Sequence, residues 1–589
     1  MKVPVRAFLS ALLALACSAT LAAQRHPASV RASASENPNW WKNAVIYEIY
    51  PRSFQDSNGD GIGDLNGITS RLDYLKSLGV DAIWLTPIYP SPQVDFGYDI
   101  SDYTNIDSQY GTLADFDRLT AEAHKRNIGI IMDLVLNHTS DQHPWFKESA
   151  SSRTNSKADW YMWHDPKMVN GHREPPNNWE SVFGHSAWEW DPARQQYYYH
   201  RFYIQQPDLN WNNPAVRKAM YDVERFWINH GVAGFRLDAI TSLFEDPQDR
   251  DEAYVNGPNG KPEINAYGDK VVQTNLTDDL PEVHNVLREL RQVADETHGR
   301  KVILIGETYL RSVDDLRKMY GPHNDELDLP MDMQIGFPPG APRLNVNWLR
   351  THIGEAETGI GGNQPLFVFD NHDNARWDRY VNDDHKDDVG RAIAAILFAS
   401  RDTAMMYYGD EIGMVTTPPT RKEDVKDPIG ITGWPKEKGR DGERTPMQWD
   451  AYGDAGFSNS PKTWLPIPPS YKTVNVAAEE HESDSMLAWY KQIIELKKSD
   501  PAIHAGEETM LNTSDPHILA WLRKSSSGEA VLVVCNLTAQ PQTASFNLKA
   551  QGVPRFHLKT LLKTPGAPDP LSLDLVQLGA YGVYIGKVE

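Results

Sequence analysis

Cysteine is almost absent from this chain of 589 residues, which contains only two, Cys17 and Cys535. Cys17 lies in an N-terminal segment that we expect to be removed, so Cys535 would remain alone and an intramolecular disulfide is excluded. Positive charge is also scarce, because 58 Lys and Arg residues stand against 80 Asp and Glu residues, a formal net charge of −22. This acidity argues against a nucleic-acid partner, since phosphates bind to basic surfaces.

Residues 1–23 have the composition of a secretory signal peptide. Lys2 and Arg6 precede a short apolar run, residues 8–15, and small residues follow it as far as Ala23. The run is too short to favour a membrane span. We therefore expect cleavage near Ala23, a secreted or periplasmic protein, and no membrane span in the mature chain.

The alternative to cleavage near Ala23 is a lipid anchor. Cys17 stands where a lipoprotein cysteine could stand, although Ala14 occupies a position where a large aliphatic residue is usual. Residues 24–38 are rich in Ala, Ser, Arg and Pro and show no apolar periodicity. They are predicted to form a flexible lead-in to the folded protein.

Eight short apolar runs alternate with longer helical patterns between residues 39 and 504. Strands of a parallel sheet are covered on both faces and read as continuous apolar stretches, so this pattern predicts an α/β fold with a (β/α)8 TIM barrel. The composition, 40% apolar and 23% charged, is that of a soluble globular protein of two or three domains. The expected strands are residues 43–50, 80–87, 128–138, 232–240, 301–309, 327–335, 365–373 and 403–413.

Two further segments stand outside the barrel pattern. Residues 139–205 are too long for a single helical crossover and carry six tryptophans, which predicts an inserted subdomain whose aromatic residues mostly pack its own small core. Residues 505–589 contain short alternating strands separated by Gly, Pro and Ser turns, which predicts a C-terminal antiparallel β-sandwich domain. The barrel would then comprise residues 39–138 and 206–504.

Charged residues gather at the C-terminal ends of the expected strands, where a barrel presents its active site. The fourth strand ends in Arg236-Leu-Asp238, whose alternate side chains face the same way, and the fifth ends in Glu307. Each motif alone is weak, because an Arg-x-Asp pair or a lone histidine is more often structural. Together they supply the carboxylates, cation and donors that glycosidic cleavage needs. The candidate residues at these ends are His138, Arg236, Asp238, Glu307, His372 and Asp373.

A separate motif, Asp56-x-Asn58-x-Asp60-Gly-x-Gly-Asp64, places oxygen ligands at alternate positions of a glycine-rich turn. Ligands that are all oxygen suit a hard cation, calcium or magnesium. The motif is not a full EF-hand, because its twelfth position is Gly67 instead of a bidentate Glu. A solvated acidic turn without a metal is the alternative.

These segments resemble the α-amylase family of glycoside hydrolases over nearly the whole mature chain. The matching segments are GVDAIWLTP, DLVLNH, GFRLDAI, GET, FDNHD and YYGDEIG, in the family's order and near its spacing. The resemblance implies that Asp238 is the nucleophile, Glu307 the general acid and base, and Asp373 the carboxylate that orients sugar hydroxyls and stabilises the transition state. It also implies a retaining mechanism through a covalent glucosyl-enzyme, in which Glu307 must hold its proton near neutral pH.

The resemblance extends to residues that would bind the substrate and the metal. It implies that His138, His372 and Arg236 bind the sugar or set the ionisation of the nucleophile, and that Tyr98 is a stacking platform. It also implies that the loop binds calcium, with the Ile62 carbonyl as an added ligand. That ion would be structural, because retaining hydrolysis by carboxylates needs no cofactor for catalysis.

Finer features resemble one branch of the family, the α-glucosidases and oligo-1,6-glucosidases. Residues 206–210, QPDLN, resemble a marker of that branch, and Asp95 in DFGYD resembles the residue that caps the non-reducing glucose. Arg440, or alternatively Arg444, would complete the cap, which implies exo-acting release of one glucose at a time. The alternative is that Asp95 and Arg440 form a structural ion pair that only holds two loops together. Ala239, after the nucleophile, resembles the small residue of α-1,4-preferring enzymes, whereas Val is typical of α-1,6-preferring ones.

The sequence therefore predicts an α-glucosidase that hydrolyses terminal α-1,4-linked glucose from maltose and short malto-oligosaccharides. Oligo-1,6-glucosidases and transglucosylases of the sucrose isomerase or trehalose synthase type share the same residues and remain alternatives. A non-catalytic protein resembling the heavy chains of amino-acid transporters would be expected to lack some catalytic carboxylates, whereas all three are present here. The expected partners are α-glucoside oligosaccharides, and no feature of the sequence indicates an oligomeric state.

Overall fold

The computed structural model of the protein describes residues 38–297, 299–338, 344–381 and 386–589. The expected signal peptide, Cys17 and the lead-in up to residue 37 lie outside these ranges. Within the described ranges, none of the helices combines the length and the apolar composition that a membrane span requires.

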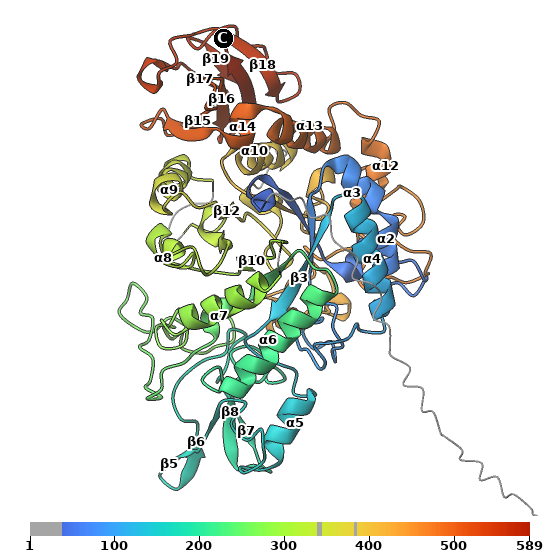
Figure 1. The fold of residues 1–589 in the computed structure, drawn as a ribbon, viewed down its shortest axis with the longest axis vertical. Coiled ribbons are helices and arrows are strands. Elements are labelled where there is room, and N and C mark those ends of the chain that lie inside the picture. The colour runs from blue at the N-terminus through green and yellow to red at the C-terminus, as the bar shows by residue number, and fades with distance from the viewer. Residues whose placement is uncertain (1–37, 298, 339–343, 382–385) are drawn as a thin grey trace, which may run out of the picture. The chain divides into compact units, whose positions relative to one another are not determined.

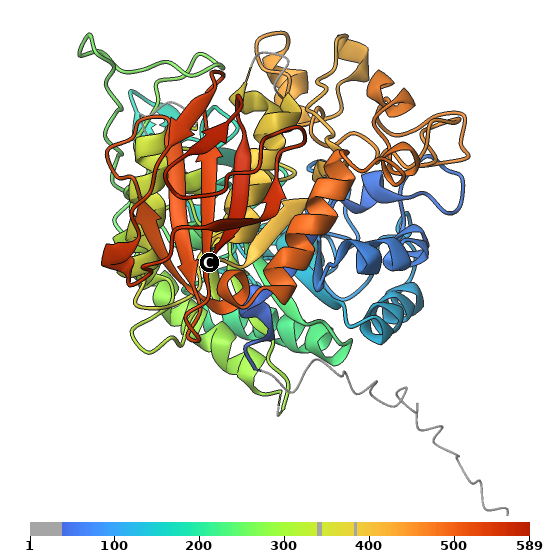
Figure 2. The same ribbon diagram turned by 90° about the horizontal axis from the view of Figure 1, so that it is seen from above.

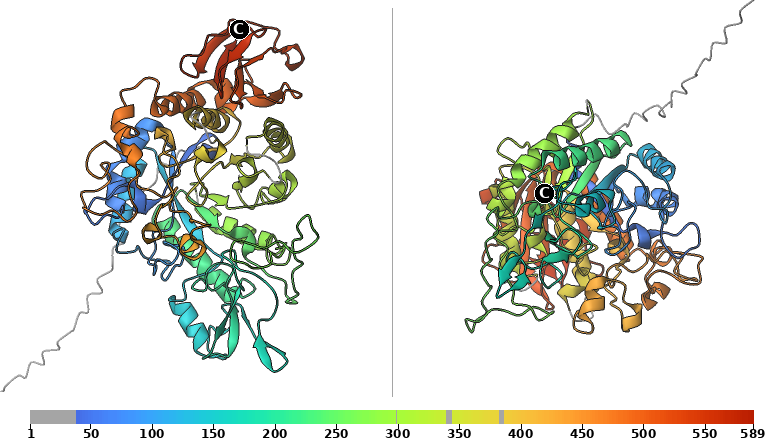
Figure 3. Two further views of the ribbon diagram at one scale, coloured as in Figure 1. Left: turned by 180° about the vertical axis from the view of Figure 1, so that it is seen from behind. Right: turned by 90° about the horizontal axis from the view of Figure 1, so that it is seen from below.

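All eight expected barrel strands form, and they run parallel in one sheet of order β12-β11-β10-β9-β3-β2-β1-β13. The ring closes where the Thr403 N–H donates to the Pro365 carbonyl (3.1 Å), just before β13 and β12. The predicted (β/α)8 barrel is confirmed, and helices surround its strands in every view (Figure 1, Figure 3). The strands are β1 (Val45–Ile49), β2 (Ala82–Leu85), β3 (Gly129–Val135), β9 (Gly234–Asp238), β10 (Ile303–Gly306), β11 (Leu329–Asp332), β12 (Leu366–Phe367) and β13 (Ala404–Tyr407).

Side chains of the barrel strands alternate between two buried clusters. Ile46, Ile131 and Ile303 belong to one cluster, made mostly of residues from the barrel strands. Their sequence neighbours Val45 and Ile130 belong to the larger cluster that includes the surrounding helices. Both faces of each strand are therefore buried, which is why these strands read as continuous apolar runs.

The helices around the barrel begin and end at capping residues. Thr112 and Asp115 form a reciprocal capping box at α4, and Asn213 caps α6 directly before Pro214. Gly79 ends α3 in the left-handed conformation. The helices are α1 (Pro51–Phe54), α2 (Leu65–Ser70), α3 (Leu72–Leu78), α4 (Leu113–Lys125), α6 (Pro214–Asn229), α7 (Val283–Asp295), α8 (Val313–Lys318), α9 (Val346–Gly359), α10 (Lys386–Ala399), α11 (Pro428–Gly433), α12 (Val476–Glu479), α13 (Met486–Ser499) and α14 (Pro501–Ala505).

Residues 139–205 fold between β3 and α6 into one helix and five short strands. Strands β4, β8 and β7 form an antiparallel sheet, and β5 pairs with β6 as a separate hairpin. Trp179 and Trp188 pack with Tyr197 and Tyr199 in a small cluster of their own. The elements are α5 (Pro144–Ser151), β4 (Trp163–His164), β5 (Lys167–Val169), β6 (His172–Glu174), β7 (Trp188–Asp191) and β8 (Gln196–Tyr199).

The C-terminal region consists of antiparallel sheets, as predicted. A five-stranded sheet has the order β14-β15-β16-β20-β18, and β17 pairs with β19. One face of the larger sheet packs with Val576 and Leu578 of β19, while Trp521 and Val533 on its other face join the cluster of the barrel helices. Figure 2 looks onto the strands of this region, drawn in orange and red. The strands are β14 (Glu507–Leu511), β15 (Ile518–Lys524), β16 (Ala530–Asn536), β17 (Gln542–Ala544), β18 (Leu558–Lys563), β19 (Val576–Leu578) and β20 (Val583–Val588).

Candidate active site

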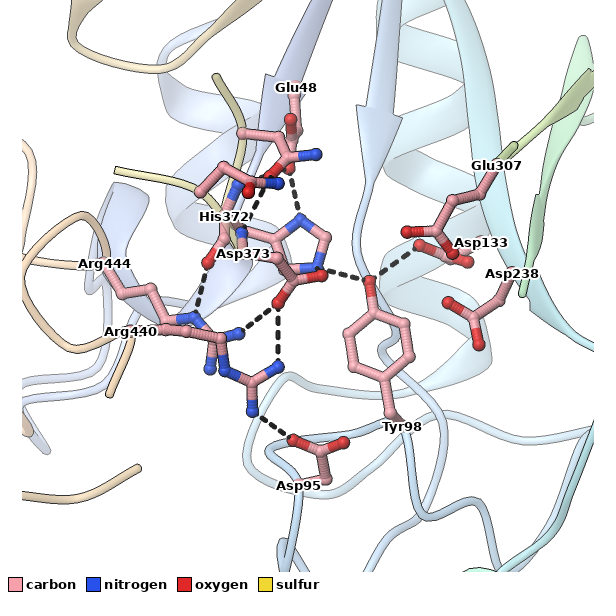
Figure 4. Close-up of polar contacts among 12 residues, drawn as sticks. Glu48, Asp95, Tyr98, Asp133, Asp238, Glu307, His372, Asp373, Arg440 and Arg444 are labelled. Atoms are coloured by element: carbon pink, nitrogen blue, oxygen red, sulfur yellow. Dashed lines mark hydrogen bonds and ion pairs between the residues drawn. The ribbon is translucent and has the colours of Figure 1, made fainter. Parts of the chain in front are cut away.

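The three predicted catalytic carboxylates lie at the C-terminal ends of barrel strands (Figure 4). Asp238 is the last residue of β9, Glu307 directly follows β10, and Asp373 lies in the loop after β12. Strands β9 and β10 are neighbours, with Leu237 paired to Gly306. The register of the sheet therefore brings Asp238 and Glu307 side by side.

Arg236, which is fully buried on β9, holds these carboxylates together. Its Nη1 lies 2.6 Å from Asp238 Oδ1 and 3.0 Å from Asp133 Oδ1, and its Nη2 lies 2.8 Å from Glu307 Oε1. The second oxygen of Glu307 accepts the Ala239 N–H (2.9 Å). One guanidinium thus fixes the positions of Asp238 and Glu307 relative to each other.

The backbone turns sharply directly after Asp238. Ala239 has φ 43° and ψ 38°, in the left-handed region that residues with a Cβ atom seldom adopt. A 3-10 helix, η2 (Ile240–Ser242), starts there. This turn directs the Ala239 N–H at Glu307, so the strained residue takes part in building the site.

Burial raises the proton affinity of Asp238 and Glu307, the central pair of carboxyls. It raises the pKa of Asp238 to about 7 against the opposing effect of Arg236. Burial also raises the pKa of Glu307 to about 7, with Asp238 and Asp373 adding to the rise and Arg236 opposing it. With both pKa values near 7, one of the two carboxyls can be ionised while the other keeps its proton near neutral pH. One ionised and one protonated carboxyl is the state that a nucleophile and a general acid require.

Asp373 has the opposite electrostatic environment. Burial alone would raise its pKa, but His372, Arg440 and Arg444 together hold the pKa of Asp373 well below its usual range. Its Oδ1 lies 2.8 Å from Arg440 Nη1 and 2.7 Å from Arg444 Nη2, and its Oδ2 lies 3.1 Å from His372 Nε2. Asp373 is therefore ionised at neutral pH and suited to accept hydrogen bonds from hydroxyl groups.

Arg440 also contacts Asp95, the residue with which the resemblance pairs it in a cap. Its Nη2 lies 2.7 Å from Asp95 Oδ1, and Asp427 accepts from its Nε (2.9 Å). Gln206 donates to Asp95 Oδ2 (3.2 Å), and its Nε2 lies 3.0 Å from His138 Nε2. These contacts join Asp95, Asp427 and the QPDLN segment in one network.

Tyr98 lies between His372 and Asp133. Its hydroxyl donates to Asp133 Oδ2 (3.0 Å) and lies 2.7 Å from His372 Nε2. The Tyr98 and His372 rings lie nearly parallel, with centroids 5.5 Å apart. Burial lowers the pKa of His138 to about 3, so this histidine is neutral and acts through hydrogen bonds.

Four residues that the structure places in the site have no role in the prediction from sequence. Glu48 on β1 contacts His372, Asp133 on β3 contacts Arg236, Asp427 holds Arg440, and Gln206 bridges Asp95 and His138. The sequence did contain a signal for Glu48, because it is the only charged residue in the apolar run VIYEI. Asp427 had none for a site, since it is the N-cap of the short helix α11, and its Asp-Pro pattern indicates only the start of a helix.

The predicted metal loop lies between α1 and α2. Asp56 accepts the Asn58 and Gly61 N–H groups, and Asn58 and Asp60 accept the N–H groups two residues further on. Asp64 caps α2 by accepting the Gly67 N–H (2.8 Å). The side chains of Asp56, Asn58, Asp60 and Asp64 thus all present oxygens within one tight turn.

The donor chemistry of this loop suits a hard cation, because its polar side-chain atoms are carboxylate and amide oxygens and the Ile62 carbonyl is close in sequence. Over the residues that the structure describes, no three or more His, Cys, Asp or Glu side chains already converge on one point as a metal site would require. The metal therefore stays a prediction.

The chain matches the alpha amylase catalytic-domain family over residues 48–506. It is 41% identical to a probable alpha-glucosidase of Rhizobium meliloti, over 87% of this chain and 92% of that protein. It is 39% identical to an oligo-1,6-glucosidase of Heyndrickxia coagulans, over 86% of this chain and 93% of that protein. The crystal structure of the trehalulose synthase MutB from Pseudomonas mesoacidophila MX-45 superposes with a TM-score of 0.82 at 34% identity, covering 93% of this chain and 99% of that one.

Proposed function

Because this chain belongs to the α-amylase family of glycoside hydrolases, we propose that it is an exo-acting α-glucosidase. Its substrates would be maltose and short malto-oligosaccharides, from which it hydrolyses the terminal α-1,4-linked glucose. The observation that carries the proposal is the pair Asp238 and Glu307, held by the two arms of Arg236 at adjacent strand ends. Such a pair can supply a nucleophile and a proton donor on one substrate.

The proposed mechanism retains the anomeric configuration. The Asp238 carboxylate attacks the anomeric carbon while Glu307 gives its proton to the glycosidic oxygen, and the leaving sugar departs. Glu307, now ionised, takes a proton from a water molecule whose oxygen attacks the glucosyl-enzyme. That step frees Asp238 and restores the proton to Glu307, so the pair ends as it began.

The release of single glucose units is supported by the network around Arg440. Arg440 joins Asp95 to Asp373 with ion pairs of 2.7 and 2.8 Å. Charged side chains that bond one another across one end of a site leave no passage for a longer chain there. Asp373 and Asp95 would then bind hydroxyl groups of the terminal glucose.

The alternatives are hydrolysis of α-1,6 linkages and transfer of glucose to another sugar. Each alternative has support, because one similar protein is an oligo-1,6-glucosidase and one similar structure is that of a trehalulose synthase. A substrate panel of maltose, isomaltose and sucrose with anomer-resolved product detection separates them. We expect glucose from maltose as the main product, and isomerised sucrose as the main product would instead establish a transglucosylase. The anomer is read from 4-nitrophenyl α-glucoside, whose only sugar is the transferred glucose, because the reducing-end glucose of maltose leaves in the anomeric form it already had. Initial release of β-glucose from that substrate would contradict retention.

The first prediction concerns linkage and the residue after the nucleophile. We expect wild type to prefer maltose to isomaltose in kcat/KM, and Ala239→Val to move that ratio toward isomaltose by about 5- to 150-fold, since added methyl groups discriminate by about 1 to 3 kcal/mol. The left-handed φ of 43° also predicts a lower melting temperature for a β-branched residue. Ala239→Ser is the control and should keep the preference for maltose. A wild type that favours isomaltose would replace our proposal with an oligo-1,6-glucosidase.

The second prediction concerns pH. Because the pKa values of Asp238 and Glu307 are both raised to about 7, kcat/KM should follow a bell. Activity falls at lower pH because Asp238 becomes protonated, and at higher pH because Glu307 loses its proton. In Glu307→Gln, assayed with 4-nitrophenyl α-glucoside, the alkaline fall should disappear while the acid fall remains. A flat wild-type profile between about pH 5 and about pH 9 would contradict this assignment.

We also propose that residues 56–64 bind a structural Ca²⁺ ion, with Mg²⁺ as the alternative. The third prediction is that unfolding and refolding in a chelator lowers the melting temperature, by mass action, and that added calcium restores it. At calcium concentrations about 100 times the Kd, the stabilisation is about 2.7 kcal/mol. Asp60→Ala should melt at the same temperature with and without calcium. A wild type whose melting curve is unaffected by the chelator would leave the loop as an ordinary turn.

We further propose that the protein is secreted or periplasmic. The proposal rests on the charges, apolar run and small residues of segment 1–23. Mass spectrometry of the mature protein should find its N-terminus near Gln24, whereas a lipid on Cys17 would establish the anchored alternative.

A further inference from the structure

Glu48 is a fully buried carboxylate below the active site. It lies on β1, paired in register with Trp84 of β2 and Tyr407 of β13. Its Oε1 lies 2.6 Å from His372 Nδ1 and also accepts the His372 backbone N–H (3.3 Å). Its Oε2 has no hydrogen-bond partner in the part of the chain that the structure describes. His372 is therefore the residue that satisfies this buried charge.

Both ring nitrogens of His372 face a carboxylate (Figure 4). Nδ1 faces Glu48, while Nε2 lies 3.1 Å from Asp373 Oδ2 and 2.7 Å from the Tyr98 hydroxyl. A neutral imidazole has only one N–H, so it would leave one carboxylate facing a bare nitrogen lone pair. The doubly protonated imidazolium is the form that matches a carboxylate at each nitrogen.

The other groups around His372 do not compete for this role. The rings of Tyr50 and Trp84 pack against it, and Arg444 Nε donates to its carbonyl (2.7 Å). Asp133 lies beyond the Tyr98 hydroxyl. Burial lowers the pKa of His372, but Asp373 and Glu48 outweigh it and raise the pKa to about 9.

We propose that Glu48 is a positioning residue that keeps His372 as an imidazolium, which forms an ion pair with Asp373 and donates its Nε2–H to the Tyr98 hydroxyl. The proposal rests on the proposed glucosidase function, because Asp373 is the carboxylate that would orient the sugar. An imidazolium has no lone pair to accept the Tyr98 proton, so the Tyr98 hydroxyl donates to Asp133 instead. Glu48 thereby sets the hydrogen-bond direction of His372, Tyr98 and Asp133 without contacting substrate.

The test compares the wild-type full-length chain with Glu48→Gln, using histidine labelled with ¹⁵N to follow the titration of His372 by NMR. We expect the midpoint to fall by at least about one pH unit, since a neutral amide no longer stabilises the imidazolium. Turnover of maltose should fall on the order of tenfold in kcat with little change in KM. Glu411→Gln is the matched control, because Glu411 is equally buried and bonds Tyr47 and Tyr74 but not His372.

Each outcome decides the proposal. An unchanged His372 midpoint in folded Glu48→Gln would overturn it, and so would an equal fall in Glu411→Gln. If Glu48→Gln does not fold, Glu48→Asp keeps the charge and should hold the midpoint near the wild-type value. A midpoint that collapses in Glu48→Asp to that of a free histidine would overturn the proposal. The titration needs no substrate, so a protein that fails to cleave maltose but shows the shift would contradict the proposed function alone.

Discussion

Asp238→Asn is expected to lower kcat on maltose by about 10⁴-fold or more while leaving the fold intact. Asn has the shape of Asp but no anionic oxygen, so it cannot form the glucosyl-enzyme. The fold should survive because Arg236 keeps its contacts with Asp133 and Glu307 after the change. The measurements are single-substrate kinetics and a melting curve.

The matched control for Asp238→Asn is Asp332→Asn. Asp332 is also buried and is also the last residue of a barrel strand, but it bonds His352 instead of the central pair. We expect the control to lose stability and to keep turnover within about tenfold of wild type. Activity of Asp238→Asn within tenfold of wild type would contradict its role as nucleophile. When the wild type reacts with 5-fluoro-α-glucosyl fluoride, mass spectrometry should find the glucosyl label on the peptide that contains Asp238.

The barrel was predictable because burial on both faces leaves a plain pattern in sequence. Each expected run, such as residues 128–138, contains a strand of the sheet, here β3. The packing of the C-terminal region was harder to predict from the sequence. Its strand β15 is buried almost throughout, because one face of the sheet packs on barrel helices and the other on β17 and β19. The sequence pattern could show the strands but not which surfaces cover them.

The site was predictable where strand ends position it and unpredictable where loops do. Asp238 and Glu307 follow from the register of adjacent parallel strands. Arg440 was found only through a family resemblance, and Asp427, which holds it, was not found. The choice between Arg440 and Arg444 also needed coordinates, because both reach Asp373 but only Arg440 reaches Asp95. Contacts between distant loops depend on the whole fold, which local patterns do not encode.

Arg440→Ala is expected to lower kcat/KM for maltose by about 10²- to 10³-fold. Arg440 neutralises three carboxylates, Asp95, Asp373 and Asp427, and its side chain is only 12% exposed. Removing one partner of such a buried network destabilises the folded site by about 3 to 5 kcal/mol, because the remaining charges stay buried without a counter-ion. Asp373 keeps Arg444 (2.7 Å), so the loss falls mainly on Asp95 and Asp427.

The same substitution should open the closed end of the site. With maltotetraose as substrate, we expect wild type to release only glucose at early times and Arg440→Ala to release maltose as well, measured by chromatography. Arg440→Lys should lie between the two, because Lys keeps the charge but cannot bond three carboxylates with one planar group. Arg421→Ala is the matched control, since that arginine is 69% exposed and pairs with Asp424, and an exposed pair contributes about 0 to 1 kcal/mol. If Arg440→Ala keeps kcat/KM within tenfold of wild type and still releases only glucose, then Arg440 only holds loops together and another group closes the site.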